Sequence, residues 1–258
     1  MKLWHTVIWW LGVASLAHHD LVRVHVAPWC MVPSAIHAPF SSLYDGARPG
    51  ETPDRQGFEF IRYNLTTFDP KATQTWADGA TTLDTWAVAG DAAVYRARPA
   101  ALPPLDRAAG FTVRVVVQVL REEHTSPDRA GWSITALGSD ARGIELGFWE
   151  GSVWAQEGGA PPALFTRAEH AAFDTTRGLV AYELTVRGDR YTLTADGTPL
   201  LSGPVRDYGA FAGPLDPYET PNFLALSDNT SSARATVRLA AVAVGAGHRQ
   251  FLPLISRT

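Results

Sequence analysis

Short stretches in which apolar and polar residues alternate recur from about residue 42 onwards. Residues 111–120 (FTVRVVVQVL) show the clearest alternation, and residues 182–194 repeat it on both sides of Gly188-Asp189. A period of two is typical of a strand with one buried face. Helical periodicity is nearly absent, and the best helix candidate is the short stretch 166–173. Many short strands separated by turn residues predict an all-β sandwich or barrel.

The stretch 131–157 (GWSITALGSDARGIELGFWEGSVWAQE) predicts three consecutive strands with two turns. Apolar residues at positions 144, 146 and 148 alternate with positions 145, 147 and 149, so one face of the middle strand is buried. A two-residue turn at Gly151-Ser152 sets Trp149 opposite Trp154. If the preceding turn sets Thr135 opposite Gly147, all three strands contribute to one shared outer face.

This outer face mixes aromatic, acidic and amide side chains, which is unusual for a buried core. It is expected to carry Glu145, Trp149, Trp154, Gln156 and Ser133, with Arg129 just beyond the end of its strand. Indole rings stack on the apolar faces of sugars, and polar groups beside them bind hydroxyls. The face therefore predicts a glycan-binding surface. The alternative is that the two tryptophans form a cross-strand pair that only stabilises the hairpin under a covering loop.

Composition narrows the class of protein. The formal net charge is -4 and the sequence pI is about 6.0, which argues against a nucleic-acid or anionic-membrane partner. The 258 residues include a single cysteine, Cys30, so no intrachain disulfide is expected. A chain of this length is ordinary for one β-sandwich.

The ends of the chain differ in character from its middle. Residues 1–17 (MKLWHTVIWWLGVASLA) predict an export signal that is cleaved after Ala17. The alternative is a later start, with the apolar stretch 21–32 as the export or anchor segment. We expect a leader or linker at 18–41, the sandwich at 42–250 and a tail at 251–258. The mature protein is then secreted or held at the cell surface, without a membrane span.

Several phrases resemble a known family. GFTVRVVVQV, YELTVRGDRYTLTADGTPLLSG and FLALSDNTSSARATVRLAAVAV resemble the concanavalin A-like lectin/glucanase jelly roll in its laminin-G-like bacterial form. More narrowly, SLYDGARPGETPDRQG, GIELGFWEGSVWAQ and LDPYETPNFL resemble the choice-of-anchor Y domain of bacterial exported proteins. The resemblance covers residues 42–244. It implies a two-sheet antiparallel jelly-roll β-sandwich and an exported location, and it brings no catalytic residues.

A carbohydrate-active hydrolase or lyase is the alternative function. Glycoside cleavage normally needs two carboxyl groups about 5–9.5 Å apart. Glu145 is the central candidate, with Glu122 and His124 as partners. The glucanases that the fold resembles carry E-x-D-x-x-E on one strand, whereas this strand reads G-I-E-L-G-F-W-E. The missing aspartate favours a non-catalytic module, and a purely structural or adhesion role stays open.

Two further features bear on ligands. Jelly rolls of this kind often hold Ca²⁺ through loop oxygens, for which Asp45 and Asp228 are the candidates, although both also suit turns. The long loop 206–222 contains three prolines and three aromatic residues. It is expected either to form a wall of the glycan-binding groove or to cover the edge of the sandwich.

Overall fold

The computed structural model describes residues 40–64, 66–213 and 216–246. The predicted signal 1–17 and tail 251–258 lie outside these residues, as does all but the end of the predicted leader 18–41. Among the residues described, no helix has the length and hydropathy needed to cross a bilayer.

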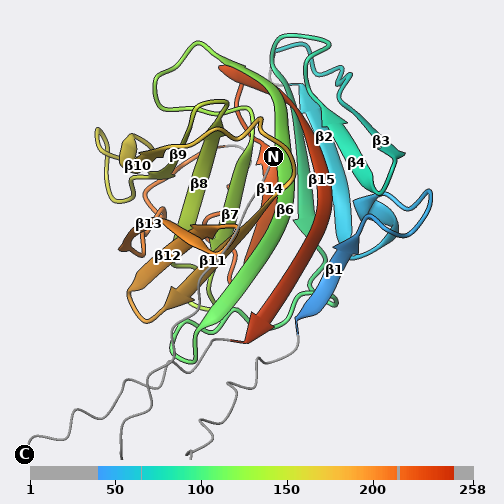
Figure 1. The fold of residues 1–258 in the computed structure, drawn as a ribbon. Coiled ribbons are helices and arrows are strands. Elements are labelled where there is room, and N and C mark those ends of the chain that lie inside the picture. Colours follow the sequence, from blue (N-terminus) through green and yellow to red (C-terminus); the bar gives the residue numbers. More distant parts are fainter. Residues whose placement is uncertain (1–39, 65, 214–215, 247–258) are drawn as a thin grey trace, which may run out of the picture. The chain divides into compact units, whose positions relative to one another are not determined.

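The described strands form two antiparallel sheets (Figure 1). The first sheet runs in the order β13 (Thr198–Pro204), β12 (Arg190–Ala195), β11 (Val180–Arg187), β6 (Phe111–His124), β15 (Ala233–Ala246), β4 (Ala80–Asp84) and β3 (Thr73–Ala77), with β1 (Ser41–Asp45) also paired to β15. The second sheet runs in the order β10 (Arg167–Ala172), β9 (Ser152–Gln156), β8 (Gly143–Trp149), β7 (Ser133–Leu137), β14 (Phe223–Asp228), β5 (Asp91–Ala97) and β2 (Phe58–Asn64). A short 3-10 helix, η1 (Pro53–Arg55), precedes β2.

The inner faces of both sheets meet in one hydrophobic core. Alternate residues of β6 and β11 from the first sheet pack with alternate residues of β8 and β14 from the second. Burial of this apolar surface is the main force that holds the two sheets together. The predicted all-β, two-sheet antiparallel jelly-roll sandwich is thereby confirmed.

Two of the predicted local elements have different outcomes. The hairpin around Gly188 is confirmed, because Arg187 pairs with Arg190 and Gly188 has a φ of 59°. The helix predicted at 166–173 is wrong: Arg167–Ala172 form strand β10, in which His170 pairs with Trp154 of β9. Pairing along the exposed edge of β9 outweighs the weak local preference for a helix.

The register of the β8–β9 hairpin differs from the prediction by two residues. Trp149 pairs with Ser152 rather than with Trp154, which lies opposite Gly147. A Cβ on residue 147 would lie 2.5 Å from the Trp154 ring, so only glycine leaves space for this indole. The β7–β8 register is shifted in the same way, with Thr135 opposite Glu145. Because two residues restore the same side-chain direction, each residue stays on its predicted face.

A buried polar link joins the two sheets at one end of the core. Thr85, which follows β4, donates its hydroxyl to Asp228 Oδ2 of β14 at 2.6 Å. The same hydroxyl accepts the backbone N–H of Ala235 at 3.0 Å. Burial raises the pKa of Asp228 well above its usual value, although the hydrogen bond from Thr85 opposes this rise.

We expect Thr85→Val to lower the free energy of unfolding by about 1–3 kcal/mol, because it leaves buried polar groups without their partner. Urea denaturation measures this loss. Thr85→Ser should retain most of the stability, and Thr198→Val on the exposed part of β13 should change it little. Equal stability of Thr85→Val and wild type would show that the link does not contribute.

The raised pKa of Asp228 also predicts a pH dependence. Because the folded state holds this proton more tightly than the unfolded state, the group stabilises the fold at low pH. That contribution is lost as the pH rises from about 4, the ordinary aspartate value, through the folded-state pKa. The difference in unfolding free energy between wild type and Asp228→Asn should therefore shift towards the variant as pH rises from 4 to 8. A difference that is constant with pH would contradict the assignment.

Candidate binding groove

The predicted glycan-binding face exists, but much of it is covered. Glu145, Trp154, Gln156 and Ser133 all point to the outer side of the second sheet, away from the core. Their exposed fractions are only 2%, 0%, 2% and 3%, respectively. The open platform expected from these residues is therefore absent, because segments distant in sequence fold back over the sheet.

The segment that follows β6 covers the two tryptophans. Arg129 accepts a hydrogen bond from Trp149 Nε1 at 2.8 Å through its carbonyl oxygen, and Asp128 accepts one from Gln156 Nε2 at 3.0 Å in the same way. The His124 ring stacks on Trp149 at a centroid distance of 3.8 Å and an interplanar angle of 3°. This part of the face therefore matches the alternative interpretation, in which the indoles stabilise the hairpin.

Arginine side chains complete this aromatic cluster. The Arg167 guanidinium carbon lies 4.5 Å from the Trp149 ring centroid and 5.2 Å from that of Trp154. Arg129, predicted to contact a sugar, instead lies 4.6 Å from the centroid of Phe165. Cation–π contacts of this kind fix the covering segments against the sheet.

The loop 206–222 covers the neighbouring part of the face and is held there by Glu145. The Tyr218 hydroxyl donates to Glu145 Oε2 at 2.5 Å, and Asn229 Nδ2 donates to Oε1 at 3.2 Å. The buried Tyr208 hydroxyl accepts from the Glu145 backbone N–H and donates to the Gln156 carbonyl, both at 3.0 Å. Burial, followed by the charge of Glu145, raises the pKa of both phenols, so they remain protonated donors.

The first residue of the loop is also fixed. The buried Arg206 guanidinium pairs with Glu157 at 2.7 Å and with Glu169 at 2.9 Å. Although burial raises the pKa of Glu169, the hydrogen bond and charge of Arg206 outweigh burial and lower it. At the backbone, Arg206 exchanges hydrogen bonds with Gly143 at the start of β8. The loop is thus tied to the second sheet both at its start and through Glu145.

A groove of about 390 Å³ remains beside this loop, over β2, β5, β7 and β14. Its aromatic lining comes from Tyr63, Phe211, Tyr218 and Phe223, and its polar lining includes Arg96, Thr135, Asp216, Ser227 and Asn229. The loop supplies Phe211 and Tyr218 and so forms one wall of this groove, which lies beside the surface predicted from Trp149 and Trp154. Rings combined with convergent hydroxyl, amide and charged groups are typical of a small-ligand site.

Sequence reasoning missed the contribution of β2 and β5 to this groove. Phe58 and Phe60 point towards the core, so alternation places Tyr63 on the outer face. This alternation is visible in the sequence. The strand order, in which β5 lies between β2 and β14, is not. Burial, followed by the charges of Asp228 and Glu145, raises the pKa of Tyr63 to about 12, so its hydroxyl stays protonated at neutral pH.

The carboxylates proposed for catalysis do not meet. Glu122 pairs with His124 at 2.9 Å, and burial raises the pKa of Glu122 although His124 opposes the rise. His124 stacks on Trp149, whereas the Glu145 carboxylate receives hydrogen bonds from Tyr218 and Asn229. The two carboxyl groups therefore have different partners. Among the described residues that line the groove, Asp216 is the only carboxylate.

The predicted calcium ligands are also separated. Asp45 pairs with Ala241 of β15, whereas Asp228 is joined through Thr85 to Ala235, six residues and roughly 20 Å away along that strand. The side chain of Asp45 accepts the N–H of Ala47, as in a turn. Within the described part of the chain, no group of three or more His, Cys, Asp and Glu side chains is arranged to hold a metal ion.

Comparison with known proteins identifies the fold. No protein-family model and no curated protein matches the chain. A solved carbohydrate esterase from the Shiga toxin-encoding bacteriophage phi24B is similar, with a TM-score of 0.54, 15% identity, and coverage of 81% of this chain and 100% of that chain. The chain has a concanavalin A-like jelly-roll fold.

Two other solved structures were also found. The metal-free carbohydrate recognition domain of Emp46p has a TM-score of 0.48 and 9% identity, covering 80% of this chain and 96% of that chain. The alginate lyase A1-II′ has a TM-score of 0.43 and 13% identity, covering 67% of this chain and 82% of that chain.

The contact between Glu145 and Tyr218 can be measured with a double-mutant cycle. We expect Tyr218→Phe alone to cost about 1–3 kcal/mol, because the buried carboxylate loses a donor. Tyr218→Phe combined with Glu145→Gln should cost less than the sum of the two single changes, with a coupling of about 0.5–3 kcal/mol. Chemical denaturation of the four proteins gives this value, and strict additivity would mean that the contact does not hold the loop.

Proposed function

We propose that this chain is an exported, non-catalytic β-sandwich module that binds a glycan in the groove formed by β2, β5, β7, β14 and the loop 206–222. The observation that carries the proposal is the lining of this groove. Half-buried rings of Tyr63 and Phe211 offer surfaces for the apolar faces of a sugar. Asn229 and Arg96 provide hydrogen-bonding groups in the same hollow.

The site differs from the one expected on the basis of Trp149 and Trp154. Those indoles are committed to packing with His124 and Arg167, whereas the groove lies on the other side of Glu145. Glu145 acts here through Tyr218 and Asn229, both of which line the groove, rather than by touching the sugar. We therefore assign Glu145 a positioning role.

The number of carboxyl groups in the groove fits binding better than hydrolysis. Acid–base cleavage needs two carboxyl groups at a suitable separation, and the described lining residues supply one. A fold shared with a phage protein named as a carbohydrate esterase supports the architecture only. The resemblance to the choice-of-anchor Y domain supports an exported, cell-surface location for the module.

Variants on opposite sides of the groove test this proposal. We expect Tyr63→Ala and Phe211→Ala each to weaken retention on a bound polysaccharide at least about tenfold, because each removes a stacking surface. Affinity electrophoresis of the full chain through gels containing soluble β-glucan, xylan or mannan identifies the ligand and measures retention.

Phe68→Ala is the matched control, because this phenylalanine is 88% exposed and does not line the groove. It should be retained as wild type is, and near-ultraviolet circular dichroism should show that all three variants are folded. No retention of wild type on any of these glycans, or equal retention of the folded groove variants, would overturn the proposed site.

A further inference from the structure

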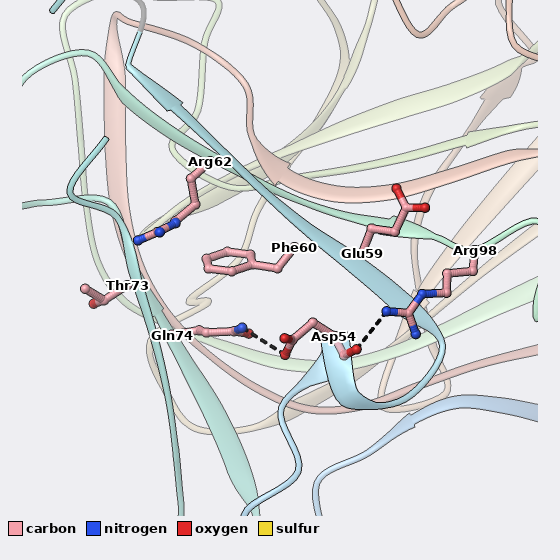
Figure 2. Close-up of a pocket in the computed structure, with 7 residues that line it drawn as sticks. All are labelled: Asp54, Glu59, Phe60, Arg62, Thr73, Gln74 and Arg98. Atoms are coloured by element: carbon pink, nitrogen blue, oxygen red, sulfur yellow. Dashed lines mark hydrogen bonds between the residues drawn. The ribbon is translucent and has the colours of Figure 1, made fainter. Parts of the chain in front are cut away.

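A second hollow lies between the free edges of the two sheets, away from the groove. β2 is the last strand of one sheet and β3 the last strand of the other, and η1 lies beside both. The hollow has a volume of about 560 Å³ and contains the side chains of Asp54, Phe60, Arg62, Gln74 and Arg98 (Figure 2). We call it the edge cleft.

Two arginines in the edge cleft form no ion pair with a carboxylate of the described residues. Arg62 Nη1 donates to the Ala72 carbonyl at 3.0 Å. Arg98 donates to the backbone carbonyls of Gln56 and Asp54 at 2.8 and 2.9 Å. No acidic side chain among the described residues forms an ion pair with either guanidinium. Two carboxylates also line the cleft: Glu59 is paired with Arg96, and Asp54 accepts a hydrogen bond from Gln74. Because both carboxylates already have other partners, an anion is the ligand that the two guanidinium groups favour.

The cleft also has an unsatisfied hydrogen-bond acceptor. Gln74 Nε2 donates to Asp54 Oδ1 at 2.9 Å, which fixes the orientation of the amide (Figure 2). Gln74 Oε1 is buried and has no partner among the described residues. A buried acceptor without a donor costs free energy, so this atom favours a ligand that brings a hydroxyl group.

The edge cleft also contains an apolar surface. Phe60 stacks on Tyr95 at a centroid distance of 5.2 Å and lies half-buried between Arg62 and Gln74 (Figure 2). Its remaining surface faces the cleft, and the Arg62 guanidinium carbon lies 5.8 Å from its centroid. A ring with an apolar C–H face fits beside it.

We propose that the edge cleft binds a uronic acid residue of an acidic glycan. The sugar carboxylate pairs with Arg62, a ring hydroxyl donates to Gln74 Oε1, and the C–H face of the ring packs on Phe60. This site is separate from the groove, so a glycan chain can contact the module at two places. The residues that form the edge cleft do not line the proposed groove.

Trigalacturonate and its methyl ester are the probes, because esterification removes the charge and leaves the ring hydroxyls in place. Isothermal titration of the full chain should show at least about tenfold tighter binding of the acid than of the ester. Acetate, a carboxylate without hydroxyls, should bind far more weakly than either sugar. Equal affinity for acid and ester, or no binding of the acid, would overturn the proposal.

Arg62→Gln should reduce the affinity for trigalacturonate about ten- to a hundredfold and make it similar to the affinity for the ester. Gln74→Ala should weaken both sugars, because it removes the acceptor for the hydroxyl. The matched control is Arg55→Gln, which removes the same charge from an exposed residue beside Asp54 that does not line the cleft. If Arg55→Gln weakens binding as much as Arg62→Gln does, the attraction is general and the site is wrong.

The groove variants separate this proposal from the proposed function. Tyr63→Ala and Phe211→Ala should leave trigalacturonate binding unchanged, whereas Arg62→Gln should leave retention on the groove's polysaccharide unchanged. Loss of trigalacturonate binding in the folded groove variants would move the acidic sugar into the groove and refute the edge cleft.

Discussion

A buried carboxylate determines what the outer face of the second sheet can do. Glu145 is 2% exposed and receives hydrogen bonds from Tyr218 and Asn229. Because a buried carboxylate without hydrogen-bond donors would cost free energy, these bonds hold the loop against the sheet. The Tyr208 hydroxyl adds contacts to the backbone of the same strand. Arg206 fixes the start of the loop, and these contacts fix the part that contains Tyr218, so they hold one wall of the groove in place.

The same contacts divide the outer face into two parts with different roles. On one side of Glu145, the stack of His124 on Trp149 closes the sheet completely over Trp154. On the other side, Tyr63 and Phe211 border a hollow that remains open. The ligand site therefore arises where the covering segments end.

The sequence predicted the strands and their faces because alternation is a local property. Glu145 and Trp154 are on the predicted face, since a two-residue error in register preserves the direction of each side chain. The turn itself was misplaced because Glu150-Gly151 and Gly151-Ser152 both suit a two-residue hairpin. The fit of Trp154 over Gly147 favours the first, and that fit depends on side-chain packing across the hairpin rather than on either turn sequence. Burial by Asp128 and Tyr218 depends on segments far away in the chain, which no local pattern reports.

The edge cleft lies where each of the two sheets ends in a strand with one unpaired edge. The free edges of β2 and β3 expose backbone groups that could pair with another chain, and charged side chains are a common protection against this. Arg62 and Arg98 fit that role through their bonds to backbone carbonyls. Protection alone does not explain why Gln74 Oε1 is buried without a donor, since an apolar side chain would protect the edge at lower cost. Among the described residues this acceptor has no donor and the two arginines form no ion pair, which a ligand explains better than protection of the edge does.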